Sequence, residues 1–194
     1  MREPAGDDQL IALVRRAQSG DTGAVGEVIR GLRTRIFRYA LARLGRREEA
    51  EDVTQEACLA LASALPGFDP DAGRFTSFVF GIASNKVLMS QRARGRRPEV
   101  PVAELPDERA DEPGPAELVE RDDTLRHLLD RLDELPDRHR DVLLLRVVAG
   151  LSADEVGDAL GVSSANVRVI QHRALASLRV RLGGGSEPPE GGAG

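Results

Sequence analysis

The sequence has few aromatic residues, one cysteine and one lysine, and these shortages limit the folds and chemistries open to it. Only 3% of its 194 residues are aromatic and tryptophan is absent, so a core must come from leucine, valine, isoleucine and alanine. With little strand signal, this composition favours helices. Cys58 is the single cysteine, which excludes an internal disulfide and fits a reducing cytoplasm.

Long apolar runs and clustered metal ligands are also missing. No run approaches the roughly 20 apolar residues that span a membrane, and the opening residues MREPAGDD lack the apolar core of a signal peptide. We therefore expect a soluble, cytoplasmic protein with no membrane association. Three histidines, one cysteine and no phosphate-binding loop give no support to an enzyme, a metal site or a cofactor.

Charge is distributed unevenly along the chain, whose formal net charge is −5. Residues 98–117 contain five prolines, seven acidic residues and one basic residue, without helical periodicity. Such a segment cannot bury enough apolar surface to fold, so we expect a flexible acidic linker. The linker divides an all-α protein into two small helical domains, residues 1–97 and 118–183, and residues 184–194 are expected to be a disordered tail.

Two short helices joined by a tight turn are predicted between Leu151 and Leu182. Ser152 and Glu155 have the spacing of a capping box, and Gly161 tolerates the left-handed conformation of a turn. Apolar residues then recur at helical spacing and predict a buried stripe, formed by Val167, Ile170, Ala174 and Leu178.

The opposite side of this second helix is expected to face outward, with four arginines and no acidic residue between Ala159 and Ser186. Turn, cap and charge together are typical of a helix-turn-helix, in which the second helix enters the major groove of DNA. The alternative is an ordinary helical hairpin with a solvated basic face.

Further helices are predicted at residues 8–19, 24–44, 48–65, 118–135 and 137–149, with another starting at Phe75. In the second of these, the arginines are interpreted as a solvated face; they are Arg30, Arg33, Arg35, Arg38 and Arg43. In the third, Val53, Ala57, Leu61 and Ala64 predict a buried stripe. A second stripe of Asp52, Gln55, Glu56 and Leu59 is either a protein-binding surface or, more often for such patterns, a plain solvated face.

The helix that starts at Phe75 is apolar in its first half and basic in its second. Aromatic residues beside a basic track are typical of proteins that stack single-stranded bases over a phosphate-binding groove. The alternative is core packing for the aromatics and a solvated end for the arginines. We expect at least two of Phe75, Phe78 and Phe80 to lie in the core.

Taken in order, these segments resemble the extracytoplasmic-function (group four) sigma factors of the sigma-70 superfamily, over about residues 8–183. Residues 50–65 (AEDVTQEACLALASAL) are similar to region 2.2, which docks on the polymerase β′ clamp. Residues 75–87 (FTSFVFGIASNKV) are similar to regions 2.3 and 2.4, which bind and open the −10 element. Residues 135–179 are similar to region 4, which reads the −35 element. The phrases LRVVAGLSADE and VRVIQHRAL are close to the actinobacterial sigma-D subfamily.

The resemblance implies a promoter-specificity subunit with no catalytic chemistry of its own. It would bind core RNA polymerase at the β′ clamp and the β flap, and direct transcription initiation at −35/−10 promoters. Its other implied partners are double-stranded promoter DNA and the melted −10 strand. An anti-sigma factor is a further candidate partner, and the free chain is expected to be a monomer. The acidic linker would thread the active-site and RNA-exit channels of polymerase.

The resemblance also assigns roles to individual residues. The candidate polymerase-docking residues are Asp52, Val53, Gln55, Glu56 and Leu59. The candidate −10 residues are Phe68, Arg74, Phe78, Asn85, Lys86, Arg92 and Arg94, with the loop from Phe68 to Arg74 receiving a flipped-out base. The candidate −35 residues are Ser164, Asn166, Arg168, Val169, His172 and Arg173. Val169 and His172 occupy positions expected to face bases, but His172 could equally contact a phosphate or face solvent.

Three positions depart from the family pattern. The family usually has tryptophan where Phe78 stands, arginine where Ser84 stands and aspartate where Met89 stands. These departures concern the detailed −10 contacts. The main alternative to the whole interpretation is an autonomous helix-turn-helix regulator that uses residues 1–97 for dimerisation or sensing and binds a two-fold symmetric operator without polymerase.

Overall fold

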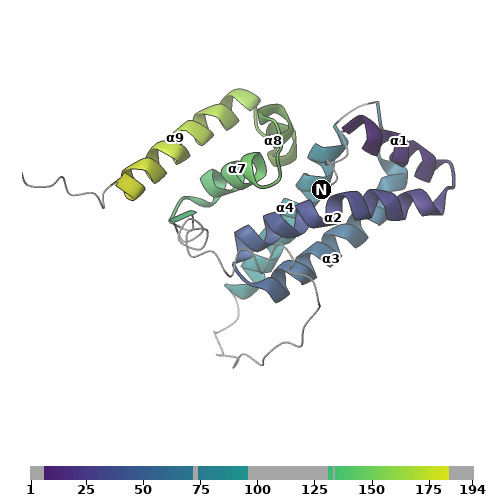
Figure 1. The fold of residues 1–194 in the computed structure, drawn as a ribbon, viewed down its shortest axis with the longest axis horizontal. Coiled ribbons are helices and arrows are strands. Elements are labelled where there is room, and N and C mark those ends of the chain that lie inside the picture. Colours follow the sequence, from purple (N-terminus) through teal and green to yellow (C-terminus); the bar gives the residue numbers. More distant parts are fainter. Residues whose placement is uncertain (1–6, 72–73, 96–130, 133, 184–194) are drawn as a thin grey trace, which may run out of the picture.

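The computed structural model describes residues 7–71, 74–95, 131–132 and 134–183, and every regular element in them is helical. The expected linker, most of the predicted helix at 118–135 and the expected tail lie outside the described residues. The elements are α1 (Asp7–Gln18), α2 (Thr22–Leu44), α3 (Arg47–Ala64), a 3₁₀ helix η1 (Leu65–Gly67), α4 (Phe75–Arg94), α7 (Asp137–Val147), α8 (Ala153–Leu160) and α9 (Ser164–Gly183) (Figure 1). The all-α prediction is confirmed for these residues.

Local sequence signals account for several helix ends. The Asp21 carboxylate accepts a hydrogen bond from the Ala24 N–H at 3.2 Å and caps α2. Gly45, at φ 72°, ends that helix in the left-handed region, where a side chain would be strained. The predicted capping box of Ser152 and Glu155 is present at the start of α8.

The N-terminal helices α1–α4 enclose an apolar core that consists mainly of aliphatic side chains with a few aromatic ones. Leu10, Val28 and Leu32 are fully buried, and Tyr39 packs edge-on against Phe80 with ring centroids 6.0 Å apart. Phe75 and Phe80 are both fully buried, while Phe78 is partly exposed. The expectation that at least two of the three phenylalanines lie in the core is confirmed.

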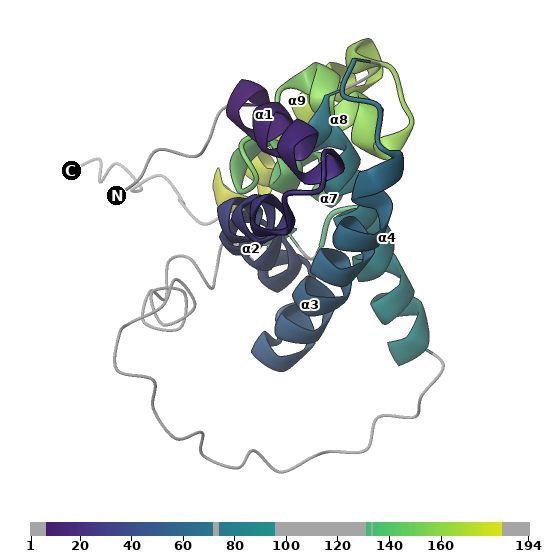
Figure 2. The same ribbon diagram turned by 90° about the vertical axis from the view of Figure 1, so that its right-hand side faces the viewer.

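The C-terminal helices α7–α9 contribute Val142, Leu144 and Val156 to the same continuous cluster of buried residues. α8 packs against α4, and α7 packs against α2. Figures 1 and 2 show α7 and α8 beside the N-terminal helices, and Figure 1 shows the far end of α9 pointing away from them. The two helical groups are therefore in direct contact in the described part of the chain.

This contact corrects the interpretation of the α2 arginines as a solvated face. Arg43 is only 3% exposed, and Arg35 is partly buried, because both reach α7 or the turn that follows it. Arg30, Arg33 and Arg38 are exposed, as expected.

Candidate nucleic-acid interface

The outward face of α9 is where most of the candidate −35 residues lie. The predicted inner stripe is confirmed, since Val167, Ile170, Ala174 and Leu178 are all buried. On the outer side, Asn166, Arg168, Val169, His172 and Arg173 are exposed, and Ser164 is half-buried at the first turn. One face of a single helix therefore presents an amide, two guanidinium groups, an imidazole and a valine to solvent.

The turn between α8 and α9 is fixed by close backbone packing. The Val162 N–H donates to the Gly157 carbonyl at 2.9 Å, and Gly161 adopts φ 66°. A Cβ on Gly157 would lie 2.6 Å from the Val162 carbonyl oxygen, so only glycine fits there. The Ser163 hydroxyl accepts from the Asn166 N–H at 3.2 Å and caps the second helix. The geometry is that of a helix-turn-helix.

The candidate polymerase-docking stripe on α3 faces solvent. Asp52, Gln55 and Glu56 are exposed, and Leu59 is 62% exposed although it is apolar. Val53, which belongs to the same candidate set, is 3% exposed and packs in the core beneath this stripe. Ala57 and Leu61 are also buried, while Ala64 is only partly so. An apolar side chain among acidic and amide groups gives this face the composition of a protein-contact surface.

An aromatic cluster lies where η1 meets α4. The Phe68 ring is 5.0 Å from both the Phe75 and the Phe78 rings, measured between centroids. Phe68 and Phe78 are only partly buried, and they line an open pocket of about 640 Å³ together with Arg74 and Asn85. Partly exposed aromatic rings beside a guanidinium group and an amide can stack and hydrogen-bond a nucleobase.

α1 anchors the segment that carries Phe68 and the start of α4. The Gln18 amide donates to the Leu65 and Phe68 carbonyls at 3.0 and 2.7 Å. The Asp7 carboxylate accepts from the Thr76 N–H at 3.0 Å, so it caps α4 from 69 residues away. Sequence reasoning missed both roles, because a cap supplied by a distant helix leaves no local spacing pattern.

The basic residues of the candidate −10 set are mostly engaged in ion pairs. Lys86 binds Glu56 at 3.1 Å, Arg74 binds Asp158 of α8 at 3.4 Å, and Arg94 binds Glu49. Arg92 is exposed in the last turn of α4. In the folded chain the positive charge of α4 is therefore partly compensated by acids of α3 and α8.

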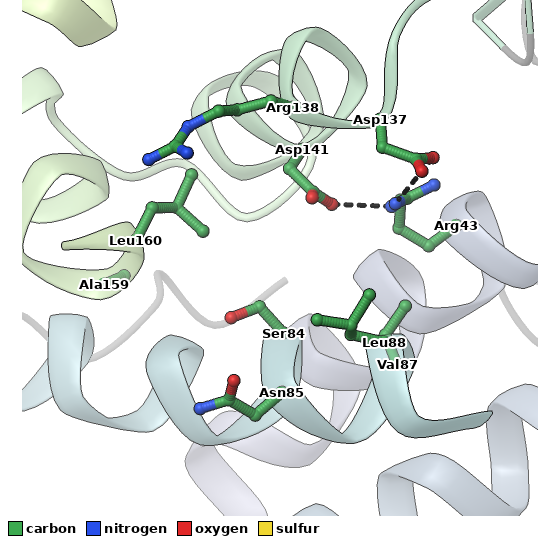
Figure 3. Close-up of a pocket in the computed structure, with 10 residues that line it drawn as sticks. All are labelled: Arg43, Ser84, Asn85, Val87, Leu88, Asp137, Arg138, Asp141, Ala159 and Leu160. Carbon is green, nitrogen blue, oxygen red and sulfur yellow. Dashed lines mark hydrogen bonds and ion pairs between the residues drawn. The ribbon is translucent and has the colours of Figure 1, made fainter. Parts of the chain in front are cut away.

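A second pocket, of about 290 Å³, lies between α4 on one side and α7 and α8 on the other (Figure 3). Asn85 lines it too, so this candidate −10 residue sits where the two helical groups meet. At its edge the Arg43 guanidinium binds Asp141 at 2.6 Å and Asp137 at 3.3 Å. Tyr39 donates to the same Asp141 oxygen at 3.1 Å.

Burial and neighbouring charges alter the ionisation of this polar cluster. Burial lowers the pKa of Arg43, but the charge of Asp141, the hydrogen bond that it accepts from Arg43 and the charges of Tyr39 and Asp137 together outweigh burial and leave the pKa raised. Burial, reinforced by the charge of Arg43, lowers the pKa of Arg140 to about 10. Burial also raises the pKa of Tyr39, so its hydroxyl stays protonated and keeps donating to Asp141. Arg43 and Asp141 therefore form an ion pair, and Arg140 lies near enough for the charge of Arg43 to act on it.

A signal for the inward position of Arg43 was present in the sequence. Arg35, Tyr39 and Arg43 follow one another at intervals of four, which places them on one face of a helix. Tyr39 is aromatic and belongs on the apolar face of this helix, so the same face includes both arginines. The sequence does not show that α7 supplies a carboxylate partner for them. The positive charge of the arginines therefore favoured a solvent-exposed position over the buried one that their spacing indicates.

Nowhere in the described residues do three or more histidine, cysteine, aspartate or glutamate side chains gather as a metal site would require. Among the helices that the structure describes, none has the length and apolar character to cross a membrane.

Family models match two parts of the chain. Residues 28–97 match "Sigma-70 region 2", and residues 131–180 match "Sigma-70, region 4". The first match contains α3 and α4 with the aromatic cluster, and the second contains the helix-turn-helix.

Named relatives match almost the whole chain. The sequence is 39% identical over 176 residues to the ECF RNA polymerase sigma factor SigD of Mycobacterium tuberculosis, covering 89% of this chain and 83% of the relative. It is 40% identical over 176 residues to the ECF RNA polymerase sigma factor ShbA of Streptomyces griseus, covering 87% of this chain and 92% of the relative.

Solved structures with the same fold include CnrH in complex with the cytosolic domain of CnrY. That chain is 26% identical to this one, with a TM-score of 0.69 over 91% of this chain and 98% of CnrH. The sigma factor RpoE of Bartonella quintana, solved with the anti-sigma factor NepR, has a TM-score of 0.58 and 18% identity, over 78% of this chain and 91% of that one.

Proposed function

The chain belongs to the sigma-70 family, among its extracytoplasmic-function (ECF) sigma factors, and we propose that it is the promoter-specificity subunit of RNA polymerase, which directs initiation at −35/−10 promoters. One observation carries the proposal. A single chain matches both sigma-70 regions in order and exposes a candidate contact face in each of them. Members of this family are transcription initiation factors rather than enzymes.

In this role α9 would enter the major groove of the −35 element. Its exposed Arg168 and Arg173 have the donor geometry for bidentate contacts to guanine or phosphate. Val169 and His172 lie on the same outward face and would meet base edges. The helix-turn-helix geometry and the absence of acidic residues along α9 support this assignment.

The aromatic pocket of Phe68 and Phe78 would receive an unpaired base of the −10 element. Taking a base out of the stack costs a few kcal/mol, which stacking on aromatic rings and hydrogen bonds from Asn85 and Arg74 would offset. The remaining basic residues of α4 would then follow the strand backbone; they are Lys86, Arg92 and Arg94. The partly exposed rings beside a 640 Å³ pocket support this role.

The exposed stripe of α3 would dock on the β′ clamp of core polymerase, with Leu59 as its apolar centre. The C-terminal helices would dock on the β flap. Neither DNA-reading surface is large, and fixing both on one polymerase makes the second contact effectively intramolecular. We expect the domain bounds 1–97 and 118–183, with the acidic linker at 98–117 threading the polymerase channels; the linker lies outside the described residues.

An anti-sigma factor that covers these surfaces is a further proposed partner, in keeping with the complex in which the similarly folded RpoE was solved. We expect the free chain to be a monomer and to act in the cytoplasm, where core polymerase is.

Run-off transcription with core polymerase on genomic fragments, followed by start-site mapping, tests the proposal. We expect polymerase-dependent transcripts with common −35 and −10 sequences, and poor promoter binding by the isolated chain. Tight binding of the free chain to a two-fold symmetric site, without polymerase-dependent transcripts, would instead identify an autonomous regulator.

A further inference from the structure

The two helical groups meet at an interface that would regulate promoter binding. This inference rests on the proposed function, because it concerns how the same chain is kept from DNA until it binds polymerase. We propose that the free chain inhibits itself: α8 lies across the −10 face of α4 and is held there by the Asp141 latch. We define this latch as Asp141 of α7 with Arg43 and Tyr39 of α2. Promoter melting would require the latch to open.

The −10 face of α4 and the surface that contacts α8 coincide. Phe78, Gly81, Asn85 and Leu88 recur at intervals of three and four and therefore form one stripe along α4. Each of them lines one or both of the pockets that α7 and α8 help to enclose. A DNA strand that followed this stripe would collide with α8.

Gly81 of α4 lies close to the end of α8. A Cβ placed on Gly81 would lie 3.5 Å from the Ala159 carbonyl oxygen and 3.9 Å from its Cα, which is direct van der Waals contact. Ala159 also lines both pockets. The backbone of α8 therefore borders the stripe at its midpoint, between Phe78 and Asn85.

Asp158 of α8 engages one of the proposed DNA contacts. Its carboxylate lies 3.4 Å from the Arg74 guanidinium, which would hydrogen-bond the unpaired −10 base once the face was open. Both side chains are largely exposed, so the pair adds little stability. Its effect is competitive, because the carboxylate occupies a guanidinium donor that the base would need.

The latch is built from polar contacts that can form and break reversibly. The Arg43 side chain is 2% exposed and the Asp141 side chain 22%, and their contact is 2.6 Å. The Arg35 guanidinium adds two hydrogen bonds to the Ala149 carbonyl, at 2.6 and 3.1 Å. Charge-assisted hydrogen bonds of this kind are strong while they are shielded from water. Once the interface opens, water molecules can take the place of the lost partners.

The two other proposed contact faces stay accessible in this closed arrangement. The α3 stripe around Leu59 and the outward face of α9 are exposed. Core polymerase can therefore bind α3 first, and its preference for the open arrangement would shift the chain toward it. Without polymerase, the chain would stay closed and could not engage both promoter elements at once.

A reversible disulfide tests the inhibitory effect of closure directly. The variant Gly81→Cys with Ala159→Cys, made in a Cys58→Ser background, puts one cysteine on each side of the α4–α8 contact, where a Cβ on residue 81 lies 3.9 Å from the Cα of residue 159. We expect the oxidised protein to give at least tenfold less run-off transcript with core polymerase than the same protein after reduction. The single variant Gly81→Cys with Cys58→Ser, treated identically, should show no effect of oxidation.

Equal transcription by the oxidised and reduced double variant would overturn the inference, as would failure of the disulfide to form in the folded protein. If neither the reduced variant nor the unaltered chain transcribes with core polymerase, the proposed function itself fails.

Opening the latch gives the complementary test. Asp141→Asn removes the charge with little change of shape, so the free chain should bind a single-stranded −10 oligonucleotide several-fold more tightly by fluorescence anisotropy. Asp154→Asn, which removes the same charge from α8 outside the latch, should bind like the unaltered chain. Unchanged binding by a folded Asp141→Asn protein would contradict the proposal.

Discussion

At the residue scale, Arg168 is the clearest candidate for reading a base. It is exposed on the outward face of α9, a helix that contains no acidic residue. Arg168→Ala should weaken −35-dependent binding of the polymerase complex by about 1–3 kcal/mol, because a bidentate contact to guanine is lost. Transcription from promoters with mutated −35 positions measures the effect.

Arg38→Ala is the matched control for Arg168, since it removes the same charge from an exposed site on α2. An Arg168→Ala profile that matched this control at every −35 sequence would show that Arg168 has no role in base recognition.

The variant Leu59→Ala distinguishes a role of this residue in polymerase binding from a role in stability. Because it is 62% exposed, Leu59→Ala should change the free energy of unfolding by less than about 0.5 kcal/mol. As the apolar centre of a docking surface, it should nevertheless weaken core polymerase binding by at least about tenfold.

Met89→Ala provides the comparison for Leu59, because Met89 is equally apolar and 61% exposed but lies on α4. Competition with the unaltered chain for core polymerase would measure both variants. Equal loss from the two would argue against a specific site on α3.

At the element scale, the turn of the helix-turn-helix depends on one close approach. Gly157→Ala would place a Cβ 2.6 Å from the Val162 carbonyl, and relieving that overlap should destabilise the protein by about 1–3 kcal/mol. It should also tilt α9 relative to α8 and reduce −35 recognition. Thermal unfolding followed by circular dichroism, together with −35-dependent transcription, measures both effects.

Gly31→Ala, within α2, should have the opposite effect on stability from Gly157→Ala. A Cβ on Gly31 of α2 would meet Leu10 Cδ2 at 3.8 Å, an ordinary contact, so alanine should stabilise the protein by about 0.5–1 kcal/mol through its higher helix propensity. A loss of stability from this variant as large as that from Gly157→Ala would show that close approach is not what distinguishes the two positions.

α1 shows how one element positions another far along the chain. Its Asp7 caps α4, its Gln18 holds the Phe68 segment, and its Arg15 pairs with Asp71 at 2.6 Å. The shape of the aromatic pocket therefore depends on a helix that contributes no candidate DNA contact.

At the scale of the whole molecule, the contact between the helical groups should couple their unfolding. One continuous cluster of buried residues and the Asp141 latch join α2 and α4 to α7 and α8. We expect a single calorimetric transition for the unaltered chain. Asp141→Asn should remove about 1.5–3 kcal/mol of hydrogen bonding to charged groups and resolve an earlier transition of the C-terminal helices.

Asp154→Asn should leave that single transition in place. Two separate transitions in the unaltered chain would mean that the two helical groups unfold independently and that the interface contributes little to stability.

The sequence by itself determined the helices, their ends and their inner faces. Helix formation, capping and amphipathic spacing act between residues a few positions apart, so the Ser152–Glu155 box, the Gly161 turn and the stripe from Val167 to Leu178 were all predictable. The resemblance to sigma factors rested on the same local motifs, and the family matches agree with it.

Only the tertiary structure decided which faces meet. Arg43 and Asp141 are 98 residues apart, and Arg74 and Asp158 are 84 apart, so no local spacing joins them. Arg43 was expected in solvent because a charged group avoids the core unless a partner offsets its desolvation, and that partner came from another helical group. The same long-range packing brought α8 onto α4, the arrangement on which the proposed control of promoter melting depends.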